Sequence, residues 1–191
     1  MPLLRKEPDA FPDDLFQLPV ESFPWMVVHV RSRQEKLLAR HLHQRSFPFF
    51  LPQIDQKRKR SGRIFTSFLP LFPGYVFVRG GADAREAVRR SNVAVNVIDV
   101  IDQERLDGQL GDIRRLQLAG ASLRPHEEFV AGDPVLIKEG AFSGYSGVVV
   151  RERGRERLLI SIALLRQSVA VEFDREMISR ARPGRDLLAS R

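Results

Sequence analysis

The sequence predicts an α+β protein of two domains, an N-terminal ferredoxin-like α/β sandwich and a C-terminal small β-barrel of the SH3-like or OB-like kind. Two observations predict this fold class. Residues 25–101 show strand and helix patterns in the order strand, helix, strand pair, strand, helix, strand. Residues 134–172 show short apolar runs separated by glycine-containing turns, which is typical of a small barrel.

The first domain opens with a strand over residues 25–30, followed by a helix. Ser32 is expected to cap this helix, and Glu35, three residues later, would complete a capping box. The helix is expected to reach Arg45, because residues that can face a core recur at helical spacing at Leu37, Leu38, His41 and Leu42.

A basic hairpin is predicted after this helix. Residues 49–52 and 65–69 have the composition of strands, and a Ser-Gly pair between them marks a turn. Five cations lie around that turn, at Lys57, Arg58, Lys59, Arg60 and Arg63. Clustered cations on a hairpin suit contacts to phosphates, and a solvated loop is the alternative interpretation.

The strand that follows has an unusual pattern. Pro73 and Gly74 form a turn, and beyond it Tyr75, Phe77 and Arg79 alternate onto one face of the strand. Valines occupy the other face and can pack against helices. Aromatic residues beside an arginine suit a partner-binding surface, whereas a strand covered on both faces is the other interpretation.

The rest of the chain divides by composition. A helix at 82–90, a strand at 93–101 and a helix at 107–119 complete the first domain, and further strands are expected at 134–138, 147–152, 158–164 and 168–172. Five segments are therefore predicted: a disordered, acidic, proline-rich tail (1–24), the sandwich (25–119), a linker (120–128), the barrel (129–181) and a flexible end (182–191).

Charge and composition narrow the function. The formal net charge of +7 is concentrated in residues 25–124, which carry +9, whereas residues 129–181 carry +1. Nucleic acid is therefore expected at the first domain. The absence of cysteine excludes disulfides and agrees with a cytoplasmic location. No apolar run reaches the roughly 20 residues that a membrane span needs.

No catalytic or metal-binding constellation stands out in the sequence. The four histidines do not pair at a useful spacing, since His41 and His43 would not share a helix face. No carboxylate pair has distinctive spacing. We therefore expect a non-enzymatic, monomeric protein with no cofactor and no metal.

Two motifs together resemble the NusG family of transcription elongation factors. Residues 25–77 resemble that family's N-terminal domain, called NGN, and residues 130–135 with 140–147 resemble its KOW module. The resemblance implies an elongation or antitermination factor that suppresses pausing or termination. The segment 163–167 lacks the Phe-Gly turn of housekeeping members, and the helix from Arg31 to His41 is similar to specialised RfaH-like paralogues.

The resemblance also implies where polymerase and nucleic acid would bind. An apolar patch on NGN domains grips the clamp helices of RNA polymerase, and the matching positions are His29, Phe72, Tyr75 and Phe77. A second polymerase contact is implied at Arg89, Arg90, Ser91 and Asn92, where a helix end stabilised by its own arginines is the alternative. Binding to non-template or upstream DNA is implied for the hairpin cations and for Arg31, Arg33 and His41.

The second domain is expected to recruit a further partner. Family KOW modules bind Rho or a ribosomal small-subunit protein, and Phe142 and Tyr145 are the aromatic candidates here. Residues 158–165 fit either a strand or a helix, and a helical form would resemble the RfaH tail that masks the polymerase site. The competing function is a ribosome-associated RNA-binding KOW protein, which the near-neutral second domain disfavours.

Overall fold

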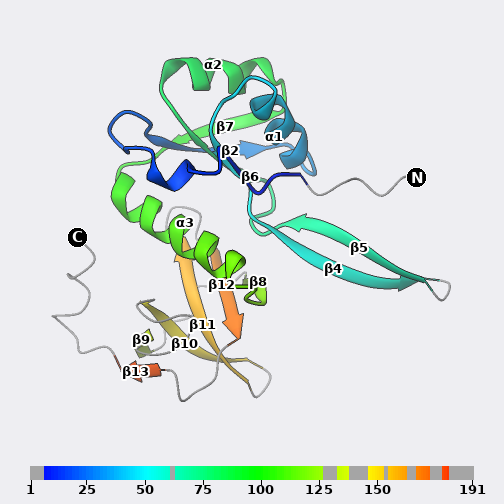
Figure 1. Cartoon of the computed structure of the whole chain (residues 1–191), viewed down its shortest axis with the longest axis vertical. Coiled ribbons are helices and arrows are strands. Elements are labelled where there is room, and N and C mark those ends of the chain that lie inside the picture. Colours follow the sequence, from blue (N-terminus) through cyan, green and yellow to red (C-terminus); the bar gives the residue numbers. More distant parts are fainter. Residues whose placement is uncertain are drawn as a thin grey trace. The chain divides into compact units, whose positions relative to one another are not determined.

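A five-stranded antiparallel sheet is the centre of the first of two compact units, residues 1–108 and 109–191. The computed structural model describes residues 7–60, 63–126, 133–137, 146–152, 155–162, 167–172 and 178–180. The strand order in the sheet is β1-β3-β6-β2-β7 (Figure 1). Its strands are β1 (Ala10–Phe11), β2 (Trp25–Val30), β3 (Phe49–Phe50), β6 (Tyr75–Arg79) and β7 (Ala94–Asp99).

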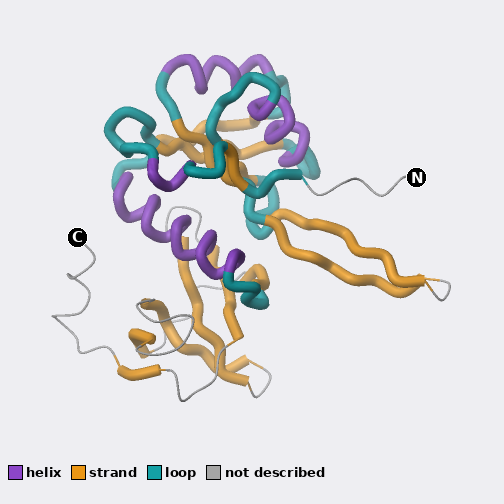
Figure 2. The backbone as a smooth tube through the Cα atoms, viewed as in Figure 1, coloured by secondary structure: helices purple, strands orange, loops and turns teal. Residues whose placement is uncertain are grey.

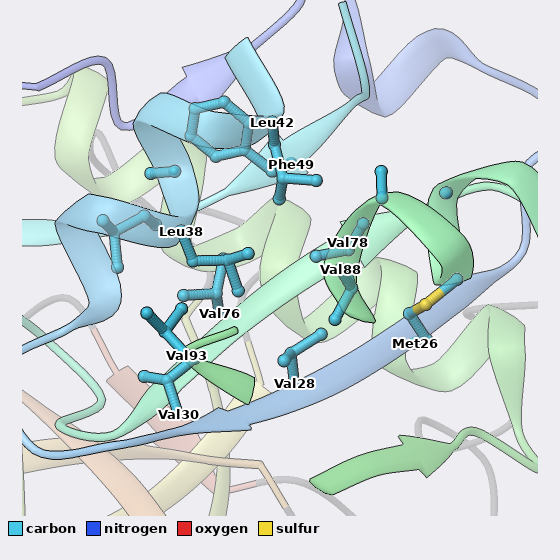
Figure 3. Packing of buried hydrophobic residues seen from close by; sticks show 14 residues of the cluster. Met26, Val28, Val30, Leu38, Leu42, Phe49, Val76, Val78, Val88 and Val93 are labelled. Carbon is cyan, nitrogen blue, oxygen red and sulfur yellow. The ribbon is translucent and has the colours of Figure 1, made fainter. Parts of the chain in front are cut away.

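One face of this sheet packs on two helices, α1 (Glu35–His43) and α2 (Ala82–Arg90). Their apolar sides meet alternate residues of β2 and β6 in a buried cluster, which Figure 3 shows with Met26, Val28, Val30, Leu38, Leu42, Val76, Val78 and Val88. The predicted alternation along β6 is therefore confirmed on its valine face. The mixed α/β architecture agrees with the predicted sandwich.

The segment before β2 is an ordered strap, and the prediction of a disordered tail is wrong for residues 7–24. Strand β1 pairs with β3 at the edge of the sheet, and the short 3-10 helix η1 (Leu15–Gln17) buries the Leu15 side chain completely. The Phe16 ring lies 5.8 Å from the Trp25 ring and 5.2 Å from Phe50. The buried Leu15 and the half-buried Phe16 outweigh the proline-rich, acidic composition on which the prediction rested.

Arg79 holds this strap on the sheet. Its guanidinium donates hydrogen bonds to the backbone oxygens of Phe23 (2.9 Å), Leu15 (2.7 Å) and Leu18 (2.9 Å). The side chain is completely buried, stacks 4.8 Å over the Trp25 ring and lies 3.3 Å from the Asp107 carboxylate. Burial lowers the pKa of Arg79, and the charge of Asp107 opposes that shift. Arg79 therefore is not the exposed partner-binding residue that its strand face suggested.

A basic hairpin is present, but its first strand is not the predicted one, because residues 49–50 form β3 of the main sheet and the cations lie within the hairpin strands themselves. It consists of β4 (Gln53–Arg60) and β5 (Arg63–Pro70), which pair in register from Gln53–Pro70 to Arg60–Arg63. The two strands form a separate sheet that extends away from the rest of the first unit (Figure 2).

The start of α1 differs from the expected capping box. The helix begins at Glu35, and Gln34 occupies the cap position without a side-chain hydrogen bond. The Glu35 carboxylate instead accepts a hydrogen bond from the backbone N–H of Gly74, 2.7 Å away. A distant backbone donor has replaced the local one that a capping box would use.

The second unit contains a six-stranded antiparallel sheet with the order β13-β9-β10-β11-β12-β8. Its strands are β8 (Leu123–His126), β9 (Asp133–Ile137), β10 (Ser146–Glu152), β11 (Arg155–Ile162), β12 (Gln167–Glu172) and β13 (Ile178–Arg180). The four predicted strands are therefore present with small boundary shifts. Closure of this sheet into an SH3-like barrel stays a prediction.

Two boundary predictions need correction, and one open alternative is resolved. Helix α3 (Gln103–Leu118) starts four residues before the predicted 107, and the division between the units falls inside it. The segment predicted as a linker contains strand β8. This strand pairs with β12, and Leu123 lies opposite Val171 in that pairing. Residues 158–165 fitted either a helix or a strand. They form a strand up to Ile162, since β11 pairs with both β10 and β12. Residues 163–166 lie outside the described part.

Among the described residues, no helix has the length and apolar character required to cross a membrane.

Candidate functional site

The four residues predicted to bind the clamp helices of polymerase do not share one exposed surface. His29 on β2 and Tyr75 on β6 are paired in register and half-buried, with ring centroids 5.2 Å apart. Phe72 and Phe77 are only 1% and 0% exposed, and their rings meet edge to face at 5.5 Å. The accessible aromatic surface at this place is therefore the His29–Tyr75 pair, whereas Phe72 and Phe77 belong to the buried interior.

A set of backbone contacts positions this aromatic pair. Gly74 precedes Tyr75 in a left-handed conformation (φ +85°), which explains why glycine is there. Its N–H donates to Glu35, and its oxygen accepts from the Val30 N–H at 2.8 Å. The start of α1 and the end of β2 therefore fix the turn from which the Tyr75 side chain emerges.

We expect Glu35→Ala to lower the free energy of unfolding by about 1.5–3 kcal/mol, the usual cost of losing a hydrogen bond to a charged group. Glu35 is buried, so water replaces the lost acceptor poorly. Urea unfolding followed by fluorescence of the single tryptophan measures the change. Glu35→Gln keeps an acceptor oxygen and should lose less, and equal losses for the two variants would contradict the role of the Gly74 contact.

An open pocket of about 480 Å³ lies elsewhere on the first unit. The strand β7 contributes residues 94–97 to it, and the surrounding side chains are Arg31, Arg85, Arg89 and Asn92. Arg31 was predicted to bind nucleic acid, whereas Arg89 and Asn92 were predicted to bind polymerase. The structure therefore brings members of two separately predicted groups into one cationic pocket.

The arginines of this pocket differ in how their charges are balanced. Arg85 forms an ion pair with Asp99, and Arg89 lies 3.9 Å from the Glu86 carboxylate. Within the described part of the chain, the Arg31 guanidinium has no ion pair or hydrogen bond, and its side chain is exposed. Arg31 is therefore the cation in this pocket best placed to receive an anionic ligand.

Sequence reasoning missed two polar members of the pocket. Arg85 and Asn96 both line it, and neither was singled out. Arg85 lies four residues before Arg89 on α2, so the sequence could have indicated that the two side chains share a helix face. No sequence pattern could have indicated Asn96, because only the sheet topology places β7 beside the turn that carries Arg31.

Arg90 and Ser91 do not line the pocket. The Arg90 side chain donates to Glu86 at 2.9 Å, and the Ser91 hydroxyl donates to the Val88 oxygen at 2.5 Å. These contacts agree with the alternative interpretation, an end of α2 stabilised by its own side chains.

His41 has a packing role between α1 and α2. Its Nε2 lies 2.9 Å from the Ala87 oxygen, which assigns the ring hydrogen to this nitrogen. Its Nδ1 lies 3.3 Å from the Arg45 guanidinium. The ring is half-buried and already has two partners. Arg33 is exposed at φ 61°, and it does not line the pocket.

The hairpin carries its cations on both faces. Lys57, Lys59 and Arg63 are exposed. Lys57 pairs in register with Thr66 and Lys59 with Ile64, which places them on one face; Arg58 pairs with Phe65 and Arg60 with Arg63 on the other. The side chains of Arg58 and Arg60 lie outside the described part of the structure.

Other predicted sites cannot be placed. Phe142 and Tyr145 lie outside the described residues, so the predicted KOW contact stays a prediction. In the described part of the chain, no group of three histidine, aspartate or glutamate side chains is arranged to hold a metal ion.

Comparison with known proteins identifies a similarity in the first unit. Residues 23–106 match the family model NusG, described as transcription termination factor nusG. The match covers somewhat less than half of the chain and includes both the His29–Tyr75 pair and the cationic pocket. No curated protein sequence matches the chain significantly. Residues 23–106 are thus similar to a family of transcription factors.

Proposed function

We propose that this chain is a NusG-type transcription elongation factor that binds the clamp helices of RNA polymerase through its first unit and suppresses pausing or termination. The observation that carries the proposal is the His29–Tyr75 pair. It lies inside the segment similar to the NusG family, and the Glu35–Gly74 contact holds it in place. Tyrosine supplies apolar area with a polar end, which suits a surface that is wet when free and buried when bound.

The buried phenylalanines have a supporting role in this proposal. Phe72 and Phe77 are buried in the turn before β6 and in β6 itself, so their packing would keep the strand that carries Tyr75 rigid. A rigid platform loses less conformational entropy on binding than a mobile one. The partner would therefore contact His29 and Tyr75 directly, and the phenylalanines would act through them.

The cationic pocket forms a second part of the proposal. Arg31, Arg89 and Asn92 would act as one contact site, either for exposed non-template DNA or for a second region of polymerase. The pocket is open, cationic and lined by two asparagine side chains that can donate and accept hydrogen bonds. These properties suit a phosphate or carboxylate flanked by polar groups.

The second unit would recruit a partner of its own, Rho or a ribosomal small-subunit protein, through a KOW module that includes Phe142 and Tyr145. We further propose that the protein is a specialised RfaH-like paralogue. The sequences of segments 163–167 and 31–41 support this part.

A binding measurement with core RNA polymerase tests the central proposal. The full chain is compared with His29→Ala/Tyr75→Ala and with Phe23→Ala, an exposed aromatic control on the same unit. We expect the double variant to bind at least tenfold more weakly, a loss of about 1.4 kcal/mol or more, and the control to bind normally. Equal binding by all three proteins, or no binding to polymerase with retained binding to RNA, would overturn the proposal.

A further inference from the structure

The two edges of the main sheet differ in how far they are protected from other strands. Strand β1 forms one edge, has only two residues and is followed by Pro12 and the exposed carboxylates of Asp13 and Asp14. Short strands, proline and charge are common protection against strand addition. Strand β7 forms the other edge, has six residues without proline or lysine, and pairs regularly with β2 from Asn96 to Asp99. Within the described residues, β7 has no strand on its outer side, so this edge is open.

The cationic pocket runs along this open edge. Four consecutive residues of β7, 94–97, line it. Because successive side chains of a strand point to opposite faces, a pocket on one face of the sheet would contact alternate residues only. Contact with all four residues places the pocket at the outer edge, where alternate N–H and C=O groups point away from β2. Val95, which is 59% exposed, is an uncovered apolar side chain there.

The charges beside the edge favour an acidic partner. Arg85 is paired with Asp99, and its guanidinium has further N–H donors beyond that contact. Within the described part of the chain, Arg89 has one carboxylate neighbour, Glu86 at 3.9 Å, and the exposed Arg31 guanidinium has none. Carboxylates of a partner can therefore form charge-assisted hydrogen bonds along this edge.

The arginines on α2 have the spacing of alternate residues in a strand. Arg85 reaches Asp99 at the end of β7, and the end of α2 leads through residues 91–93 into the start of β7, so helix and strand run antiparallel. Arg85 and Arg89 lie four residues apart, about 6 Å along the helix axis. Side chains on one face of a strand lie about 6.6 Å apart. A strand with carboxylates at alternate positions therefore matches the pocket in charge and in spacing.

The main-chain groups of β7 distinguish a polypeptide partner from a nucleic acid. The outer side of β7 offers both N–H donors and C=O acceptors, and an extended polypeptide pairs with both. The sugar–phosphate backbone of DNA carries acceptors alone, so it would leave the carbonyl groups of β7 without donors. The open edge therefore favours protein over DNA as the partner of this pocket.

We propose that an extended acidic segment of a partner protein adds as a strand to the outer edge of β7, a proposal that rests on the proposed function because it names the partner of the cationic pocket. The main chain of this segment pairs with β7, and carboxylates at alternate positions contact Arg31, Arg85 and Arg89. An apolar side chain of the segment covers Val95. Main-chain pairing supplies affinity, and the carboxylates supply selectivity.

Fluorescence anisotropy of the full chain with a labelled peptide of about ten residues, in which glutamate alternates with threonine or valine, measures this binding. A peptide with lysine in place of glutamate should bind about tenfold more weakly or worse. Two further peptides carry N-methyl groups on the glutamates or on the intervening residues. Because an edge pairs with alternate N–H groups, only one of these two should lose binding. Equal binding by the two N-methylated peptides would overturn the inference.

A charge reversal at Arg31 tests the pocket. Arg31→Glu should weaken binding of the glutamate peptide about tenfold and bind the lysine peptide more tightly than the wild type does. Arg105→Glu, an equal change of charge at an exposed position of α3, should leave both affinities unchanged. In hydrogen exchange, the glutamate peptide should protect N–H groups of β7. Protection confined to other strands would contradict strand addition at this edge.

Single-stranded DNA and a second copy of the chain are the other occupants to be measured. If single-stranded DNA binds more tightly than the glutamate peptide and Arg31→Glu abolishes that binding, the pocket belongs to nucleic acid. If sedimentation shows self-association of the wild type that Arg31→Glu abolishes, the edge belongs to a second copy. Either result would overturn the inference.

Binding to core RNA polymerase separates strand addition from the proposed function. If the wild type binds polymerase through the His29–Tyr75 pair and does not bind the glutamate peptide, only strand addition at β7 is wrong. If the wild type binds the peptide with the expected dependence on Arg31 and N-methylation but does not bind polymerase, the proposed function fails and strand addition stands.

Discussion

Replacing Arg79 with alanine is expected to lower the free energy of unfolding of the first unit by about 3–5 kcal/mol, the range observed when one member of a buried charged network is removed. Three backbone oxygens of the strap would lose their donor, and the Asp107 carboxylate would lose its ion pair. The strap would also lose its attachment to β6, which exposes Leu15 and Phe16.

Urea unfolding followed by Trp25 fluorescence measures this loss directly. The Trp25 ring lies under the Arg79 guanidinium and donates its indole N–H to Asp107, so the signal comes from the affected region. Arg105→Ala, on the exposed side of α3, is the matched control and should change stability by less than about 0.5 kcal/mol. A loss for Arg79→Ala as small as that of the control would contradict the structural role assigned to it.

Local periodicity explains what could be predicted of this fold. Strands β2 and β6 and helix α2 were predicted correctly, because each is specified by residues within its own segment. The side of β6 that carries Arg79 was also predicted. The strap that covers Arg79 was not, because its main contacts are backbone carbonyls, which every residue has and no sequence pattern reveals.

In the candidate site, too, local sequence patterns could not predict the long-range contacts. Strand alternation singled out Tyr75 and the family resemblance singled out His29, and the cross-strand register that pairs them comes from the fold. The Glu35–Gly74 contact joins residues 39 positions apart. A capping box was the better local interpretation of Glu35, and only the tertiary fold supplied a competing donor. The pocket likewise combines three chain segments that only the sheet order brings together.

The burial of Phe77 leads to a second large expected effect. Phe77→Ala should lower the free energy of unfolding by about 3–5 kcal/mol, because the ring is completely buried and its removal leaves a cavity. The Phe72 ring at 5.5 Å and the Phe50 ring at 6.4 Å would lose their aromatic neighbour. Tyr75→Ala removes a ring of similar size from a half-buried position, so it should cost considerably less.

The comparison of Phe77→Ala with Tyr75→Ala decides how polymerase-binding data on β6 should be interpreted. If Phe77→Ala weakens binding only at temperatures or urea concentrations where it begins to unfold, Phe77 acts through the fold. Tyr75→Ala should weaken binding while its unfolding curve stays close to that of the wild type. If Phe77→Ala is as stable as Tyr75→Ala and still binds polymerase poorly, the Phe77 ring must become accessible to the partner, and the assignment of direct contact to His29 and Tyr75 alone would be wrong.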